Sequence, residues 1–235
     1  MKPIVFCASL PQEVKPLCHR LGIPVPRPGS WFSEGVTQSG YAVQVIVSGV
    51  GRERMKKRLL SMPARSVNCW VSLGFAGGLS SPLSAGDCII GHRILSSIGS
   101  RLSSCVESES SDLLYCSDSA ICTPREKQKL FLQTGALAVD MESAAVAEHA
   151  MRREEPFVWI RVISDTVEES VPQALFQCFS PDGFPSIYNS CKVLLKYPWL
   201  THSLIRMGFR SERGASRLAE SVLPWLLLFH SPAYS

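Results

Sequence analysis

Short apolar runs separated by helical stretches constrain this chain more than any other feature. Residues 3–8, 67–73 and 157–163 are mainly apolar runs of strand length without strict alternation. Such runs are typical of strands that are buried on both faces, as in a parallel sheet covered by helices. Helical patterns lie between them, for example at 11–21 and 142–152. The sequence therefore predicts an α/β fold, a three-layer α/β/α sandwich with a mixed central sheet.

The remaining elements follow from the same patterns. We expect strands at 31–36, 41–47, 88–96, 113–123 and 136–139, and helices at 52–62, 124–133, 187–196 and on to about 229. Glycine-rich turns are expected at 48–51 and 74–78, and the serine-rich segment 97–112 is expected to be the least ordered. Because we find no repeat and no linker, residues 1–235 are read as a single domain with a helical C-terminal extension from about 182.

Composition excludes several classes of protein. Apolar residues make up 46% of the chain and charged residues 19%, which argues against wholesale disorder, and a net charge of +4 is too small to argue for nucleic acid. The nine cysteines show no CxxC spacing, and the five histidines are scattered, so we expect no metal and no cofactor. The N-terminus does not resemble a signal peptide, and no apolar run reaches the roughly 18 residues of a spanning helix, so a cytoplasmic location is expected.

Three loops follow strands, at 48–51, 74–78 and 164–165. Ligands of open α/β sheets bind beyond the carboxyl ends of the strands, so these loops are expected to converge on a site. The first loop has Arg54 where a dinucleotide fingerprint would have its third glycine, and the second lacks the lysine of a P-loop. A nucleotide-phosphate site of either type is therefore not indicated.

Carboxylates at two strand ends are the candidate chemical groups. Asp140 and Glu142 precede a helix, where acidic side chains interact favourably with the helix dipole. Alternatively, Glu142 could bind sugar hydroxyls through its two acceptor oxygens. Asp165 ends an apolar strand, where burial should raise its pKa and make it a proton donor, although an Asx turn or a cap is the alternative. Arg161 in the same strand is read as a buried ion-pair partner.

Four segments of the chain form an ordered set of motifs: Gly74-x-Ala76-Gly77-Gly78-Leu79, Gly86-Asp87, Val139-Asp140-Met141-Glu142-Ser143-Ala144-Ala145 and Arg161-Val162-Ile163-Ser164-Asp165. Taken together they resemble the motifs of the nucleoside phosphorylase superfamily, and most of all those of its nucleosidase branch, which cleaves methylthioadenosine and S-adenosylhomocysteine. The resemblance spans residues 1–172. It implies the nucleoside phosphorylase-like fold and cleavage of an N-glycosidic bond.

The resemblance assigns three catalytic residues. Asp165 matches the general acid that protonates N7 of the purine, and Ser164 matches the neighbour that orients it. Glu13 matches the carboxylate that activates the attacking water, and Gln12 is its rival if the alignment shifts by one residue. A proton donor suits this chemistry because a purine is a poor leaving anion.

The resemblance also assigns the substrate contacts. Glu142 matches the ligand of the ribose hydroxyls, and Met141 matches the apolar floor under the sugar. The chain departs from the nucleosidases at Phe75, where they have a small hydroxyl residue, and at Ala120, near their adenine-stacking phenylalanine. The further expected substrate contacts are Phe75, Ala76, Gly77 and, through its backbone, Ile121.

Two routes of cleavage stay open. Hydrolysis is favoured because Glu13 is present and no arginine lies between Asp165 and Pro172 to hold phosphate. Phosphorolysis, with inorganic phosphate as co-substrate, would need an anion nest, for which the candidates are Gly49, Gly51, Arg52 and Arg54. A nucleoside-binding protein without activity is a third reading, motivated by Phe75 and Ala120.

The C-terminal third resembles a subgroup called hopanoid-associated phosphorylases, whose implied task is removal of adenine from adenosylhopane. The motifs are Val171-Pro172-Gln173-Ala174 and Pro181-Asp182-Gly183. A basic stripe at His202, Arg206, Arg210, Arg213 and Arg217, with apolar residues at 204, 207 and 225–229, predicts peripheral contact with a membrane. The family further implies a homodimer that acts on a small-molecule nucleoside, which could be lipid-linked. No nucleic-acid partner is expected.

Overall fold

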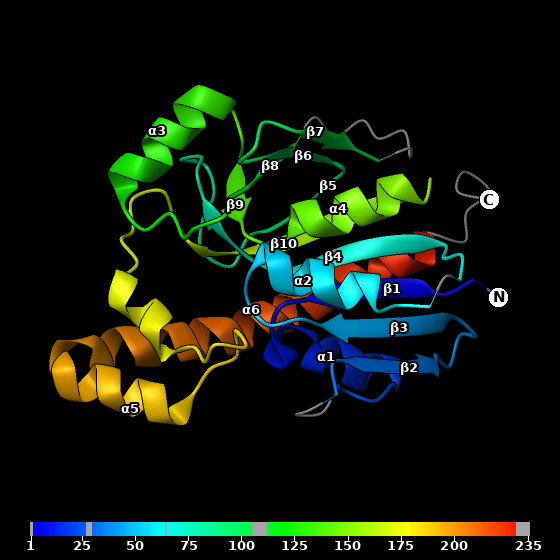
Figure 1. Ribbon diagram of the computed structural model, residues 1–235, viewed down its shortest axis with the longest axis horizontal. Coiled ribbons are helices and arrows are strands. Elements are labelled where there is room, and N and C mark those ends of the chain that lie inside the picture. Colours follow the sequence, from blue (N-terminus) through cyan, green and yellow to red (C-terminus); the bar gives the residue numbers. More distant parts are fainter. Residues whose placement is uncertain (1, 27–29, 64, 105–111, 229–235) are drawn as a thin grey trace.

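The computed structural model describes residues 2–26, 30–63, 65–104 and 112–228 (Figure 1). The strands are β1 (Ile4–Ala8), β2 (Phe32–Val36), β3 (Ala42–Val47), β4 (Cys69–Gly78), β5 (Cys88–Gly91), β6 (Arg93–Ser96), β7 (Arg101–Ser103), β8 (Leu113–Cys116), β9 (Ala138–Asp140) and β10 (Phe157–Asp165). The helices are α1 (Pro11–Leu21), α2 (Arg52–Leu60), α3 (Pro124–Thr134), α4 (Ser143–Arg152), α5 (Ile187–Lys196) and α6 (Thr201–Leu228), with short 3-10 helices η1 (Gln173–Cys178) and η2 (Pro198–Leu200).

One mixed sheet contains all ten strands, with β4 at its branch point. The main path runs β2-β3-β1-β4-β9-β8-β6-β7, and β10 pairs with both β4 and β5. The pairs β1/β3, β1/β4 and β4/β10 are parallel, whereas β4/β9 and β5/β10 are antiparallel. The carboxyl ends of β1, β4 and β10 consequently meet at one edge, where the functional loops were expected to converge.

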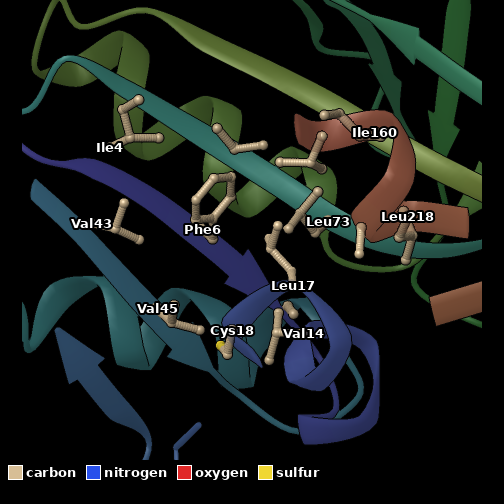
Figure 2. Close-up of a cluster of buried hydrophobic side chains, with 14 of the residues drawn as sticks. Ile4, Phe6, Val14, Leu17, Cys18, Val43, Val45, Leu73, Ile160 and Leu218 are labelled. Atoms are coloured by element: carbon tan, nitrogen blue, oxygen red, sulfur yellow. The ribbon is translucent and has the colours of Figure 1, made fainter. Parts of the chain in front are cut away.

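Side chains of β1 alternate between two cores, one on each face of the sheet. Ile4 and Phe6 belong to the core that α1 and α6 cover, as Figure 2 shows, and Val5 and Cys7 belong to the core that α2 and α4 cover. Because both faces are apolar, β1 reads as a continuous apolar run in the sequence. The predicted three-layer α/β/α sandwich with a mixed central sheet is confirmed.

Some expected boundaries were wrong. The glycine-rich turn expected at 74–78 is the second half of β4, which pairs with β10 and β9 and so stays extended. The strand expected at 113–123 ends at Cys116. The serine-rich segment contains β7 and the turn before it, while residues 105–111 lie outside the described part of the chain.

The chain after residue 172 forms a helical arm and then returns to the core. η1, α5 and the first half of α6 lie together beside the sandwich (Figure 1), around a small core that includes Leu175, Val193 and Leu200. The second half of α6 packs against α1 and β10. Leu226 is buried there and Trp225 is partly buried against the same core, so these two residues contribute mainly to the fold. No helix in the described part of the chain combines the length and the apolar character that crossing a membrane requires.

Candidate active site

A β-bulge at the end of β10 points the Ser164–Asp165 pair into the site. The regular register with β4 holds up to Ile163, paired with Ala76, and then shifts so that Asp165 lies opposite Gly77. Bulges re-aim side chains at the ends of strands in this way. Ser164 Oγ lies 2.5 Å from Asp165 Oδ1 and 3.2 Å from the carbonyl oxygen of Ala76, which fixes both side chains.

A cavity of about 1000 Å³ lies at this edge of the sheet. It collects residues from β4, β10, the start of α1, the β9–α4 junction, η1 and α6. The predicted catalytic and substrate residues that line it are Glu13, Phe75, Ala76, Gly77, Ile121, Met141, Glu142, Ser164 and Asp165. Gln12 and Ala120 line it as well, so these two alternatives also lie at the site.

Asp165 lies in a more polar setting than its apolar strand suggested. Its Oδ2 accepts a hydrogen bond from the ammonium of Lys127, on α3, and the two groups form an ion pair. The Lys127 side chain is fully buried, whereas that of Asp165 is 15% exposed. The apolar strand did not reveal this contact, because a helix distant in sequence brings the buried cation to Asp165.

Glu13 is both a helix cap and a cavity residue. Its Oε2 accepts hydrogen bonds from the amides of Ser9 (2.9 Å) and Leu10 (2.8 Å), which closes the first turn of α1. Its Oε1 makes only a long contact of 3.4 Å with the amide of Phe75. Burial raises the pKa of Glu13, although these amides and the charge of Arg161 act in the opposite direction. One oxygen is thus fixed by the cap, and the other is left with a weak partner.

Gly74 makes room for that carboxylate. Its φ of +156° and its missing side chain let β4 pass close to Glu13, since a Cβ at position 74 would lie 2.9 Å from Glu13 Oε1. A glycine that the sequence suggested for a turn therefore serves close approach of a catalytic candidate to the strand.

Glu142 is held by a loop amide. Its Oε1 accepts a 2.6 Å hydrogen bond from the amide of Gly51, at the start of α2. Burial and the negative charge of Asp140 raise the pKa of Glu142 to about 7, against the opposing effects of Gly51 and Arg161. Glu142 can therefore exchange its proton near neutral pH, while its position in the cavity is fixed.

Asp140 has a structural role. Its carboxylate accepts hydrogen bonds from the amide and hydroxyl of Ser143, and Oδ2 is 2.5 Å from Arg161 Nη2. Arg161 also donates to the carbonyl oxygen and the hydroxyl of Ser72, so every nitrogen of its guanidinium is used. The predicted role of Arg161 as a buried ion-pair partner is confirmed by this geometry.

The loop expected to bind phosphate is occupied by other contacts. The amides of Gly49 and Val50 donate to the carbonyl oxygens of Ser9 and Gly183, and the amide of Gly51 donates to Glu142. Arg52 forms ion pairs with Glu148 and Asp118, and Arg54 donates to the carbonyl oxygens of Val50 and Pro181. Gly49, Gly51 and Arg52 are not among the residues that line the cavity, whereas Val50 of the same loop is.

Helix α6 forms a wall of the cavity that the sequence did not assign to it. Arg210 forms hydrogen bonds with both carboxylate oxygens of Glu169, each 2.8 Å, and with the carbonyl oxygen of Ser164. Arg213 and Arg217 line the same cavity. Three arginines of the expected membrane stripe thus face the site, and the side chain of Arg206 lies outside the described part of the structure. The spacing of three and four residues between these basic side chains correctly predicted that they share one face of a helix. It did not indicate what that face contacts.

Comparison with known proteins finds solved structures that share this fold. The sequence profile of the Phosphorylase superfamily matches residues 112–182. The structure is similar to that of futalosine hydrolase of Helicobacter pylori, with a TM-score of 0.71, 17% identity, and coverage of 96% of this chain and 97% of that chain. It is also similar to the 5′-methylthioadenosine/S-adenosylhomocysteine nucleosidase of Helicobacter pylori, with a TM-score of 0.69, 17% identity, and coverage of 96% and 98%.

A third similar structure is the MTAN of Chlamydia trachomatis bound to MTA, with a TM-score of 0.67, 14% identity, and coverage of 97% of this chain and 100% of that chain. At these identities the likeness shows the fold.

Proposed function

We propose that this protein cleaves the N-glycosidic bond of an adenine nucleoside by hydrolysis. The observation that carries the proposal is the meeting of Glu13, Glu142 and Asp165 in one cavity, from three distant parts of the chain. The similarity to nucleosidases in fold and the match to the Phosphorylase superfamily over residues 112–182 support it. The resemblance of the motifs supplies the roles.

Each of the three carboxylates has a separate role in the proposed reaction. Asp165 protonates the leaving purine, and Ser164 holds the carboxyl through Oδ1. Glu142 binds the ribose hydroxyls and stabilises the charge that develops on the sugar as the bond breaks. Glu13, through its loosely held Oε1, directs a water molecule to the anomeric carbon. Such positioning of reactants supplies much of the rate in reactions of this kind.

Hydrolysis is proposed over phosphorolysis because the candidate anion nest is already filled. The amide of Gly51 holds Glu142, and the guanidinium of Arg52 is committed to Glu148 and Asp118. A phosphate ion would have to displace these contacts. Phosphorolysis and a methylthioadenosine or S-adenosylhomocysteine substrate remain the alternatives that the experiment below separates.

We propose a bulky apolar group on the 5′ side of the nucleoside, with adenosylhopane as the specific candidate. The lining of the cavity also includes the apolar residues Leu175, Phe176, Phe179 and Leu204. A cavity of about 1000 Å³ has room for more than a nucleoside. The resemblance of the C-terminal motifs to hopanoid-associated phosphorylases points to this lipid.

A substrate panel tests the proposal directly. Adenosine, methylthioadenosine, S-adenosylhomocysteine and a lipid-linked adenosine are each incubated with and without phosphate, and free adenine is measured by chromatography. We expect release without phosphate, fastest for the lipid-linked substrate, and loss of more than about 10²-fold in rate in Asp165→Asn. Nucleoside binding without any release at high protein concentration would support the non-catalytic reading instead.

We further propose peripheral contact with a membrane, on a surface other than the predicted stripe. The helical arm exposes apolar side chains beside two lysines of α5, Lys192 and Lys196. The exposed apolar side chains of the arm are Ile187, Tyr188, Leu195, Trp199, Ile205 and Phe209. Aromatic and aliphatic groups beside cations suit an anionic lipid surface.

Co-sedimentation with anionic liposomes at low and high salt tests this contact. Trp199→Ser combined with Leu195→Ser should reduce binding, while Leu132→Ser, at an exposed apolar position on α3, should not. Equal binding by both variants would contradict the assignment of this surface. A cytoplasmic homodimer, which the resemblance implies, is proposed as well, and light scattering of the purified protein measures its mass.

A further inference from the structure

Lys127 is a buried charged residue beside the candidate acid, and the proposed mechanism does not use it. It is the buried residue of α3, with an exposure of 0%, whereas Lys129 on the same helix is exposed. Lysine is seldom fully buried unless its ammonium is paired, because removing that charge from water is costly. The position of Lys127 therefore requires strong compensating contacts.

Three acceptors surround the Lys127 ammonium, and all belong to one turn. Nζ donates to Asp165 Oδ2, to the carbonyl oxygen of Thr166 (2.6 Å) and to that of Glu169 (2.8 Å). An ammonium has three protons, so its hydrogen-bonding capacity is filled by the segment that directly follows β10. Lys127 thereby ties α3 to the turn that carries the candidate acid.

Other charged and titratable groups lie around this pair. Arg210 of α6 binds Glu169, and its charge acts on Asp165 as well. Cys122, in the loop before α3, lies near both partners, and burial raises the pKa of its thiol. Glu126 is occupied by Thr123 at the cap of α3. Among these groups, only Lys127 donates to the Asp165 carboxylate as a cation.

We propose that Lys127 is a positioning residue for the reaction, which holds the carboxyl of Asp165 in the orientation that the reaction needs. This inference rests on the proposed function. Oδ2 is fixed by Lys127 and Oδ1 by Ser164, so the carboxyl cannot rotate freely. The placement of the proposed acid therefore depends on α3 as well as on β10.

Three variants test this role against a matched control. Lys127→Gln keeps a donor but removes the charge, Lys127→Arg keeps the charge, and Lys129→Gln removes an exposed charge from the same helix. The kcat and KM of adenine release are measured for each variant, together with the thermal unfolding temperature.

The kcat of Lys127→Gln should fall by about tenfold or more, with a smaller change in KM, because the acid is less well placed. Lys127→Arg should recover part of this loss, and Lys129→Gln should behave as wild type. If Lys127→Gln is too unstable to assay, Lys127→Arg is still decisive, since a rise in KM without a fall in kcat would overturn the proposal.

The Lys127→Gln/Asp165→Asn double variant separates this inference from the proposed function. If Lys127 acts through Asp165, the double variant is no slower than Asp165→Asn alone. A full-sized loss from Lys127→Gln in both backgrounds would show a merely structural lysine and overturn the inference. If Asp165→Asn itself has no effect, the proposed function fails, whatever Lys127 does.

Discussion

Glu142 is proposed to bind the ribose hydroxyls, yet its buried position disfavours its ionised form. Burial and the nearby Asp140 raise its pKa from 4.5 to about 7. A carboxyl whose pKa is higher in the folded than in the unfolded protein stabilises the fold below its unfolded value, near pH 4.5. That contribution is lost as pH rises through about 7. The fold therefore tolerates an unfavourable charge at this position above neutral pH.

Glu142→Gln should remove this pH dependence. Between pH 5 and pH 8 the free energy of unfolding of the variant should improve relative to wild type by on the order of 2 kcal/mol. Urea denaturation at both pH values measures it. Glu53→Gln, at an exposed carboxyl on α2, is the control and should follow wild type at both pH values. A parallel loss of stability in wild type and Glu142→Gln would contradict the raised pKa.

The same variant tests the contact with ribose. Glu142→Gln should raise KM and lower kcat together, because hydroxyl contacts act in the ground state and in the transition state. A 2′,3′-dideoxy nucleoside should lose rate on the wild-type enzyme but little further rate on the variant. If the two defects simply multiply, Glu142 does not bind the hydroxyls.

At the scale of elements, α6 and β4 fit together through one aromatic ring and one glycine. Phe75 lies where the nucleosidases that the sequence resembles have a small residue, and Gly214 of α6 leaves space for its ring. A Cβ at position 214 would lie 2.6 Å from Phe75 Cε1, which is too close for an unstrained contact. The missing side chain at position 214 therefore makes room for the large side chain at position 75.

Gly214→Ala should be less stable than Gly208→Ala. Both changes gain helix propensity, up to about 1 kcal/mol each, but a Cβ at position 208 would meet open space. The difference in thermal unfolding temperature between the two variants measures the clash. Adding Phe75→Leu to Gly214→Ala should recover part of the loss. Equal stability of the two alanine variants would show that α6 does not pack on Phe75 as described.

Patterns in the sequence predicted elements better than they predicted contacts between elements. The helices at 11–21 and 187–196 follow the expected ranges, because periodic apolar residues and caps are local signals. The glycines at 74–78 suggested a turn, yet they lie in β4, since pairing with β10 and β9 overrides local preference. The basic spacing of α6 indicated one face, but only the packing shows that this face lines the cavity.

At the scale of the whole molecule, the sheet brings together at one edge residues that are far apart in the chain. Each carboxylate of the proposed site lies at or next to the end of an element that motifs in the sequence could locate, so their shared cavity could be anticipated. Lys127 could not be anticipated, because nothing in the polar pattern of α3 distinguishes it from Lys129. Its contact with Asp165 arises only when α3 folds over the end of β10.

The most direct test of the central claim is the fate of oxygen during turnover. The purified protein is given the best substrate of the panel in phosphate-free water enriched in the heavy oxygen isotope, and the sugar product is analysed by mass spectrometry. The account predicts stoichiometric release of adenine with the heavy isotope at the anomeric carbon, and loss of both in Asp165→Asn. Absence of release until phosphate is added, with a sugar phosphate as product, would contradict it.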